Sequence, residues 1–365
     1  MKFTFAILVL LTMTANMFAK VTRQPAGTAD GKSVELYTLQ DGKITVKILT
    51  YGGIVQSIEA PDRNGKSTNI VQGFDGLDGY VQTGNKPYMG AIIGRYANRI
   101  AGGNFKLNGK TYNVPKNDGD NALHGGVEGF NKKVWAAKEI KNGVELTYTS
   151  PNGEQGFPGA LTTTVRYTLV GNELRIEYTA KTDADTVLNL TNHSYFNLKG
   201  QGEGDILGHE LKLNAKRYTP VDKNLIPIGE LAPVTGTPFD FLKLTAIGQW
   251  IDADNEQLKL AHGYDQNWVL DSEGKTVAVA AEAYEPTTGR VLEVLTDQPG
   301  IQFYTGNFLD GTVTGTGGKV YQRRYAFCLE TQHYPDSPNH PAFPTTVLKP
   351  GQTFHSTTIY RFSAR

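Results

Sequence analysis

Residues 191–198 read Thr-Asn-His-Ser-Tyr-Phe-Asn-Leu and close a longer stretch, 187–198, whose residue character alternates with a period of two. One set of alternate positions is largely apolar and includes Phe196, whereas the other carries His193 and Tyr195. Because successive side chains of a strand point to opposite faces, this alternation predicts a strand with one apolar and one polar face. Histidine, tyrosine and asparagine donate and accept hydrogen bonds, and histidine exchanges protons near neutral pH. The polar face therefore predicts the wall of a cleft for a polar ligand.

A second informative stretch, residues 325–333, reads Tyr-Ala-Phe-Cys-Leu-Glu-Thr-Gln-His. Its alternation predicts a strand that ends near Glu330, with Ala326 and Cys328 on the same face as the carboxylate. These small neighbours leave room for a ligand, and burial would raise the pKa of Glu330 toward the range that suits a general base. Four prolines in residues 333–344 forbid regular pairing, so a rigid loop is expected after the strand.

The composition of the chain is typical of an all-β protein. It contains 41 Gly, 17 Pro, 18 Tyr and 16 Phe, so both turn residues and strand formers are abundant. Only short helical turns are expected, at 77–81 and 246–251. Several expected strands are joined by Asp-Gly, Asn-Gly or Gly-Asn turns, and the pattern predicts a large antiparallel β-sandwich. The expected strands include 34–39, 44–49, 144–149, 162–169, 174–180, 277–281 and 291–295.

The beginning of the chain has the features of a secretory signal peptide. In residues 1–19, Lys2 precedes a short apolar run that is too short to span a bilayer as a permanent helix. Cleavage is expected after Ala19 or Ala15, and the protein is expected to be periplasmic or secreted. Residues 20–365 contain no evident linker or break in composition and are expected to form a single domain.

The charges of the chain balance, with 36 basic and 36 acidic residues. This balance does not indicate nucleic acid or an anionic membrane as a partner, and a monomer or weak dimer is expected. Cys328 is the only cysteine, so an intramolecular disulfide is excluded. We interpret Cys328 as a buried apolar residue, because an apolar strand raises the pKa of a thiol. At least two of the three tryptophans are expected in the core.

Six distinctive motifs are spread along nearly the whole chain after about residue 30. They are GRYANRI (94–100), NALHGG (121–126), GFPG (156–159), TNHSYFNL (191–198), DQPGIQFYTGNFLDG (297–311) and LETQHYPDSPNHPAFP (329–344). In content and order they resemble the galactose mutarotases, also called aldose 1-epimerases. The resemblance implies a twisted β-supersandwich with its active cleft on a concave face. It also implies an isomerase that interconverts the α and β anomers of free aldohexoses such as galactose and glucose.

The reaction of that family opens and closes the sugar ring. A base takes the proton of the C1 hydroxyl while an acid gives one to the ring oxygen, and the ring then closes on the other face of the carbonyl. The resemblance implies that Glu330 is the base, His193 the acid, and His124 a second donor near the ring oxygen. Since proton transfer alone achieves this chemistry, no metal, nucleotide or other cofactor is expected.

The resemblance also implies a set of side chains that bind sugar hydroxyls. Asp265 would accept hydrogen bonds from two adjacent hydroxyls, and Gln266 stands where many family members carry His. Arg95 is expected to have a structural role, because arginine favours fixed, forked pairing. The other implied sugar-binding residues are Asn98, Arg99, Tyr195 and Gln298.

Three other functions compete with anomer interconversion. A glycoside hydrolase could use Asp265 and Glu330 as its pair of carboxylates, although that chemistry does not require His193. A non-catalytic carbohydrate-binding protein on the same fold would be expected to have lost Glu330 or His193. A sugar-phosphate mutarotase would need a basic phosphate clamp, and the motifs contain no such cluster. Anomer interconversion is therefore the preferred hypothesis.

Overall fold

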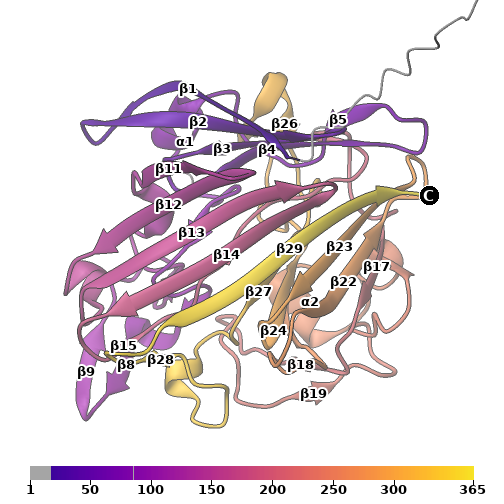
Figure 1. Ribbon diagram of the computed structural model, residues 1–365. Helices are drawn as coiled ribbons and strands as arrows, with labels where there is room; N and C mark the ends of the chain where they lie inside the picture. Colours follow the sequence, from indigo (N-terminus) through magenta and orange to yellow (C-terminus); the bar gives the residue numbers. More distant parts are fainter. Residues whose placement is uncertain (1–17, 85) are drawn as a thin grey trace, which may run out of the picture.

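Three antiparallel sheets dominate the fold (Figure 1). The computed structural model describes residues 18–84 and 86–365. The first sheet, at the top of Figure 1, contains β1 (Lys20–Ala29), β2 (Lys32–Asp41), β3 (Ile44–Leu49), β4 (Val55–Pro61) and β5 (Ser67–Asn69). The largest sheet has the order β11 (Ala136–Ile140), β12 (Gly143–Ser150), β13 (Leu161–Val170), β14 (Glu173–Thr182), β29 (Phe354–Ala364), β23 (Arg290–Thr296), β22 (Ala278–Tyr284), β17 (Glu210–Leu213) and β20 (Thr245–Ala246). The third sheet has the order β19 (Ala232–Pro233), β18 (Arg217–Thr219), β21 (Asp265–Val269), β24 (Gly300–Tyr304) and β27 (Cys328–Gln332).

Short ladders and helical turns connect these sheets. Neither α-helix of the described residues, α1 (Leu77–Gln82) or α2 (Glu256–Ala261), is long and apolar enough to cross a membrane. The two-stranded ladders pair β7 (Arg99–Ile100) with β10 (Ala122–Leu123), β8 (Asn104–Leu107) with β9 (Lys110–Asn113), β6 (Ile92–Ile93) with β16 (Thr191–Asn192), β15 (Thr186–Val187) with β28 (Val347–Leu348), and β25 (Val313–Thr314) with β26 (Val320–Tyr321). Turns of 3₁₀ helix lie at Ala101–Gly103, Phe130–Lys132, Glu154–Gly156, Ile247–Gln249, Thr316–Gly318 and Ser337–Asn339.

The all-β prediction is confirmed, and each strand named from the sequence overlaps an observed one. The strand expected at 44–49 is β3 itself, and the strand expected at 162–169 is the centre of β13. Along β13 buried residues alternate with more exposed ones, so this sheet covers the core with one face. The helical turn expected at 77–81 is α1, whereas 246–251 contains only a 3₁₀ turn.

Helix α2 was not predicted from the sequence. Its ends are nevertheless defined by local chemistry. The side chain of Asn255 accepts hydrogen bonds from the backbone N–H groups of Gln257 and Leu258, which is a typical N-cap. His262 ends the helix in a left-handed backbone conformation.

The continuous strand predicted over residues 187–198 is wrong. Only β15 and β16 pair as strands there, with single bridges at Asn189 and Phe196, and the whole stretch is buried. The side-chain amides of Asn189 and Asn192 donate to backbone carbonyls of neighbouring segments. These amides thus bond to carbonyl groups that backbone N–H groups would pair with in a regular ladder. The segment therefore contributes to several short ladders instead of one long strand.

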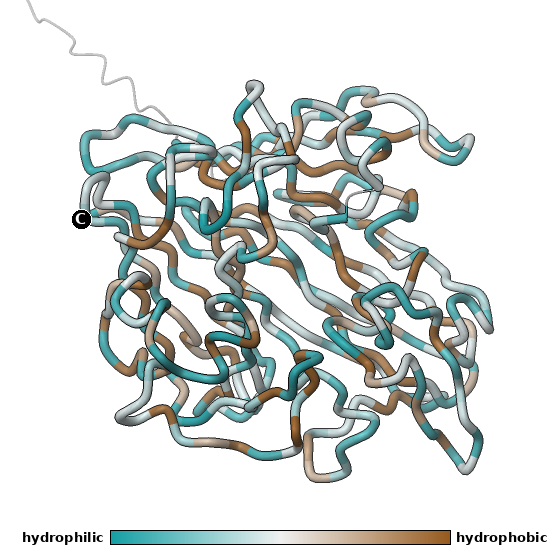
Figure 2. Tube along the Cα trace, turned by 180° about the vertical axis from the view of Figure 1, so that it is seen from behind, coloured by the Kyte–Doolittle hydropathy of each residue, from teal (hydrophilic) through white to brown (hydrophobic). Residues whose placement is uncertain are grey.

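The main hydrophobic core contains side chains from all three sheets. Trp135 and Trp268 are buried in it, whereas Trp250 is 47% exposed, so the expectation of at least two core tryptophans is confirmed. Figure 2 shows hydrophilic segments at hairpin tips on the outside and apolar segments along the inner strands. This shared core fixes the third sheet against the other two, and the third sheet carries the site.

Candidate active site

The site is built on three neighbouring strands from distant parts of the chain. The register of β21, β24 and β27 places Asp265 opposite Tyr304, and Gln302 opposite Glu330. Residues directly opposite in an antiparallel pair lie on the same face of the sheet. These four side chains therefore share one face. Strand β27 continues two residues beyond Glu330, where the sequence predicted its end.

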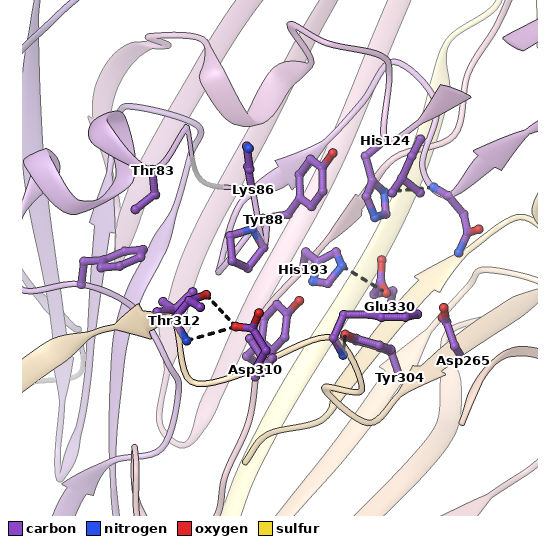
Figure 3. A pocket seen from close by; sticks show the side chains of 18 of the residues that line it. Thr83, Lys86, Tyr88, His124, His193, Asp265, Tyr304, Asp310, Thr312 and Glu330 are labelled. Atoms are coloured by element: carbon purple, nitrogen blue, oxygen red, sulfur yellow. Dashed lines mark hydrogen bonds and ion pairs between the residues drawn. The ribbon is translucent and has the colours of Figure 1, made fainter. Parts of the chain in front are cut away.

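A cavity of about 480 Å³ lies against this face, within the range of about 300–1,000 Å³ that is usual for small-molecule sites (Figure 3). Aromatic and apolar side chains such as Tyr88, Tyr304 and Leu309 form much of its wall. Apolar walls with a few convergent polar groups are typical of a site that orients a small polar ligand. The predicted site residues that line the cavity are Asn98, Arg99, His124, His193, Tyr195, Asp265 and Glu330.

His193 and Glu330 form a buried pair in the middle of the cavity wall. Nε2 of His193 lies 3.6 Å from Oε1 of Glu330, and the two side chains point toward one another in Figure 3. Burial raises the pKa of Glu330 well above its ordinary value, and the charge of Asp265 raises it further. Burial lowers the pKa of His193 to about 4. Burial therefore favours a protonated Glu330 beside a neutral His193.

Aromatic rings fix the position of the His193 imidazole. Tyr195 stacks on it with ring centroids 5.1 Å apart, and Tyr88 stacks at 6.0 Å. Nδ1 of His193 lies 3.5 Å from Sγ of Cys328, which leaves Nε2 facing the carboxylate. Tyr88 was not predicted, because it belongs to a loop without a repeating pattern. The rings limit the contact of His193 with water, which explains its low pKa.

His124 is held as a hydrogen-bond donor. Its Nδ1 accepts a hydrogen bond of 3.1 Å from the backbone N–H of Asn98, so neutral His124 carries its proton on Nε2. Burial lowers the pKa of His124 well below its ordinary value, and the charges of His193 and Arg99 lower it further. Gly125 permits this tight turn, since a Cβ there would lie 2.1 Å from the backbone oxygen of Gly94. The arrangement supplies a fixed N–H that stays neutral at pH 7.

Three side chains of the site could in principle offer ligand atoms to a metal ion. Atoms of His124, His193 and Glu330 lie within 4.8 Å of one another. Coordination through Nε2 of His124 would move its proton to Nδ1, where it would face the backbone N–H of Asn98. The hydrogen bond to Asn98 therefore disfavours a metal at this position.

Activity is expected to be independent of metal ions. Prolonged treatment with a chelator, followed by gel filtration, should leave the rate of sugar turnover unchanged. Activity that falls on chelation and returns with added zinc would contradict this prediction.

Asp265 and Arg99 form a second polar group at the cavity. Nη1 of Arg99 lies 3.7 Å from Oδ2 of Asp265, and Nε of Arg99 donates to Asp118 at 2.7 Å. Nε2 of Gln302 donates to Oδ1 of Asp265 at 2.7 Å. Burial raises the pKa of Asp265, while the charge of Arg99 opposes that shift. Asp118 and Gln302 were not predicted; the alternation within 297–311 places Gln302 on the face of Tyr304 and could have indicated it.

Two glutamines named in the sequence analysis do not line the cavity. Gln298 precedes β24 and does not line the cavity; its Oε1 lies 2.9 Å from Nδ1 of His333. Its position does not support the predicted contact with sugar. Gln266 points away from the cavity and donates through Nε2 to the backbone oxygen of Gln257, which attaches β21 to α2.

Arg95 has the structural position expected for it, but its partners are different. It is 2% exposed, and its guanidinium donates to the hydroxyl of Ser150 and to the backbone carbonyls of Ser150, Pro151, Pro158 and Gly159. Backbone carbonyls therefore replace the expected carboxylate. The hydrogen bonds join two loops beside the site without reaching the cavity.

Known proteins resemble this chain over nearly its whole length. A family model for aldose 1-epimerase matches residues 35–361. The chain is 44% identical to galactose mutarotase from Rattus norvegicus, over 97% of this chain and 99% of the relative. It is 37% identical to aldose 1-epimerase from Escherichia coli (strain K12), over 93% of this chain and 98% of the relative. The crystal structure of galactose 1-epimerase from Lactobacillus acidophilus NCFM matches with a TM-score of 0.82 and 29% identity, covering 95% of this chain and 99% of that one. The chain belongs to the aldose 1-epimerase family.

Proposed function

We propose that this protein is a mutarotase, an isomerase that interconverts the α and β anomers of free aldohexoses such as galactose and glucose. The observation that carries the proposal is the buried pair of Glu330 and His193, 3.6 Å apart, in a cavity lined by hydrogen-bonding side chains. The C1 hydroxyl and the ring oxygen are bonded to the same carbon, so a closely spaced base and acid can serve both.

In this proposal, Glu330 and His193 share one proton in two arrangements. The first is a carboxylate beside an imidazolium, and the second is a carboxylic acid beside a neutral imidazole. Attraction between the charges favours the first, and burial favours the second. Ring opening converts the first into the second: Glu330 takes the proton of the C1 hydroxyl, and His193 gives one to the ring oxygen. Closure reverses both transfers, so the pair returns to its starting state with no net gain of protons.

The surrounding side chains would orient the sugar. Asp265 would accept hydrogen bonds from hydroxyls, while Arg99 and Asn98 would donate to them. The N–H of His124 would donate to the ring oxygen and stabilise the charge that develops there. Because these groups are already held by the protein, they need little reorganisation when the sugar binds.

The same geometry argues against a glycoside hydrolase. Such an enzyme needs two carboxylates beside the scissile bond, one of them free to act as nucleophile or base. Here the group in contact with Glu330 is His193 rather than a second carboxylate, and Asp265 is bonded to Arg99 and Gln302. A purely sugar-binding protein would have no use for a base and an acid in contact.

Polarimetry provides the test of this function. The protein should accelerate the change of optical rotation of freshly dissolved α-galactose or α-glucose, and it should release no phenol from aryl glycosides. Cleavage of aryl glycosides without faster mutarotation would favour the hydrolase.

The rate is expected to depend on pH as a bell-shaped curve. Below about pH 4, His193 is protonated beside protonated Glu330, so no base is available. Above the raised pKa of Glu330, the pair loses its single proton, so no acid is available. The midpoints of both limbs are properties of the coupled pair and not of either residue alone. Initial rates of mutarotation, corrected for the uncatalysed reaction, should show both limbs; a rate that rises steadily through the alkaline range would contradict the shared proton.

We propose further that the enzyme acts in the periplasm or outside the cell, as a monomer or weak dimer without a nucleic acid or membrane partner. The support is the composition of residues 1–19, of which 1–17 lie outside the described residues, and the balanced charge. Mass spectrometry of the mature protein should find its N-terminus near Lys20 or Asn16. Analytical ultracentrifugation should show a monomer or a weak dimer. Intact Met1 in a soluble cytosolic fraction would overturn the proposed location.

A further inference from the structure

A layer of buried amide side chains lies behind the proposed base. The register places Asn267 opposite Gln302, Gln302 opposite Glu330, and Gln332 opposite Gly300, so these polar side chains share the face of the sheet that carries the site. Each of Asn267, Gln302, Glu330 and Gln332 is at most 2% exposed. The layer is therefore closed to bulk solvent.

Many polar atoms of this layer have no hydrogen-bond partner among the described residues. They are Nδ2 and Oδ1 of Asn267, Oε1 of Gln302, Nε2 and Oε1 of Gln332, and Oε2 of Glu330. The two oxygens of Glu330 thus have different surroundings. Oε1 faces His193, while Oε2 is buried without a hydrogen-bond partner among the described residues.

The amides do not serve ordinary core packing. On the opposite face of the same strands, Trp268, Phe303 and Leu329 are buried in the hydrophobic core. Apolar residues would fill the amide face at lower cost, because a buried polar group without a partner destabilises a protein. Gly300 lets the Asn267 amide pack against the backbone, since a Cβ at this position would lie 2.4 Å from Oδ1 of Asn267. Buried polar groups that lack a protein partner are where proteins hold ordered water.

We propose that the amides of Asn267, Gln302 and Gln332, bridged by ordered water molecules, form a hydrogen-bonded layer that stabilises the ionised form of Glu330 through Oε2. Nε2 of Gln302 already donates to Asp265, so Gln332 and Asn267 supply the free N–H donors. These are positioning residues, since they act on the sugar only through Glu330. The inference rests on the proposed function, because it assigns a role to the base of that reaction.

Other groups around Glu330 also affect the stability of its ionised form. Arg99 stabilises the carboxylate, whereas burial and Asp265 destabilise it. Donated hydrogen bonds favour the charged form of a carboxylate, so the amide layer adds to the effect of Arg99. The titratable and charged groups that face Glu330 are His193, Asp265, Arg99, Cys328, Tyr195 and Tyr360.

The test is the pH profile of mutarotation in Gln332→Met, which keeps the side-chain volume and removes the amide. Loss of the donors should shift the shared-proton pair toward its neutral arrangement. The rate on the plateau should fall about tenfold, and the midpoint of the alkaline limb should move up by about one pH unit. Above both midpoints the rates of variant and wild type should converge, because the ionised carboxylate predominates in both enzymes.

Asn267→Leu provides an independent variant with the same expected profile, should Gln332→Met fail to fold. Gln72→Met is the matched control: Gln72 is fully buried and also has an unpartnered amide oxygen, but it lies outside β21, β24 and β27, and its Nε2 donates to the backbone oxygen of Tyr325. Its alkaline limb should stay in place even if the protein becomes less stable. Equal loss of rate at every pH in Gln332→Met or Asn267→Leu would overturn the role of the layer. A folded wild-type protein that is inactive on every aldose would instead refute the proposed function.

Discussion

Replacing Glu330 by glutamine is expected to lower kcat for mutarotation by at least about a hundredfold. Positioned acid–base groups contribute on the order of 10²–10⁴-fold to a rate, and an amide cannot take the proton of the C1 hydroxyl. Glutamine keeps the size and most of the hydrogen-bonding capacity of the side chain. Sugar binding should therefore survive, because Asp265, Arg99 and Asn98 are unchanged. Polarimetry measures kcat, and calorimetry measures the affinity for galactose.

Thermal unfolding provides the control for this variant. Burial disfavours the charged form of Glu330, so removing the charge relieves a desolvation cost. The Tm of Glu330→Gln should therefore equal or exceed that of the wild type. If the folded variant kept more than about a tenth of the wild-type kcat, Glu330 would not be the base. Asp265 would then be the first candidate.

Replacing His193 by asparagine should have an effect of similar size, at least about a hundredfold on kcat, since it removes the acid. The double variant of Glu330 and His193 should be slower than either single variant by much less than the product of the two factors. Groups that act as one unit lose most of their effect when either member is removed. Factors that multiply would show that the two residues act independently and would contradict a shared proton.

Much of the fold could be predicted because its strands are long and one-sided. In β13 and β14, apolar and polar residues alternate over most of the ten positions, and a Gly-Asn turn joins the two strands. Local sequence contains all of that information. The segment 187–198 has a similar alternation, but the amides of Asn189 and Asn192 bond to distant backbone carbonyls. No local pattern shows where such partners lie.

The residues of the candidate site likewise include some that the sequence could predict and some that it could not. His193, Glu330 and Asp265 belong to motifs that can be recognised in the sequence, and the structure brings all three to one cavity. Gln298 and Gln302 belong to one motif and have the same parity, but β24 begins at Gly300, so only Gln302 lies within the strand. Tyr88 comes from an irregular loop, and its stacking on His193 depends on how that loop folds over the sheet.

The most direct test of the central claim is exchange spectroscopy by NMR on an equilibrium mixture of α- and β-galactose. This measurement detects interconversion of the anomers without any net reaction. With wild-type protein, exchange peaks should connect the two anomeric protons. With the same concentration of Glu330→Gln these peaks should vanish, while broadened sugar lines show that galactose still binds. Exchange peaks of wild-type strength with the variant, or none with folded wild type, would contradict the proposed proton relay.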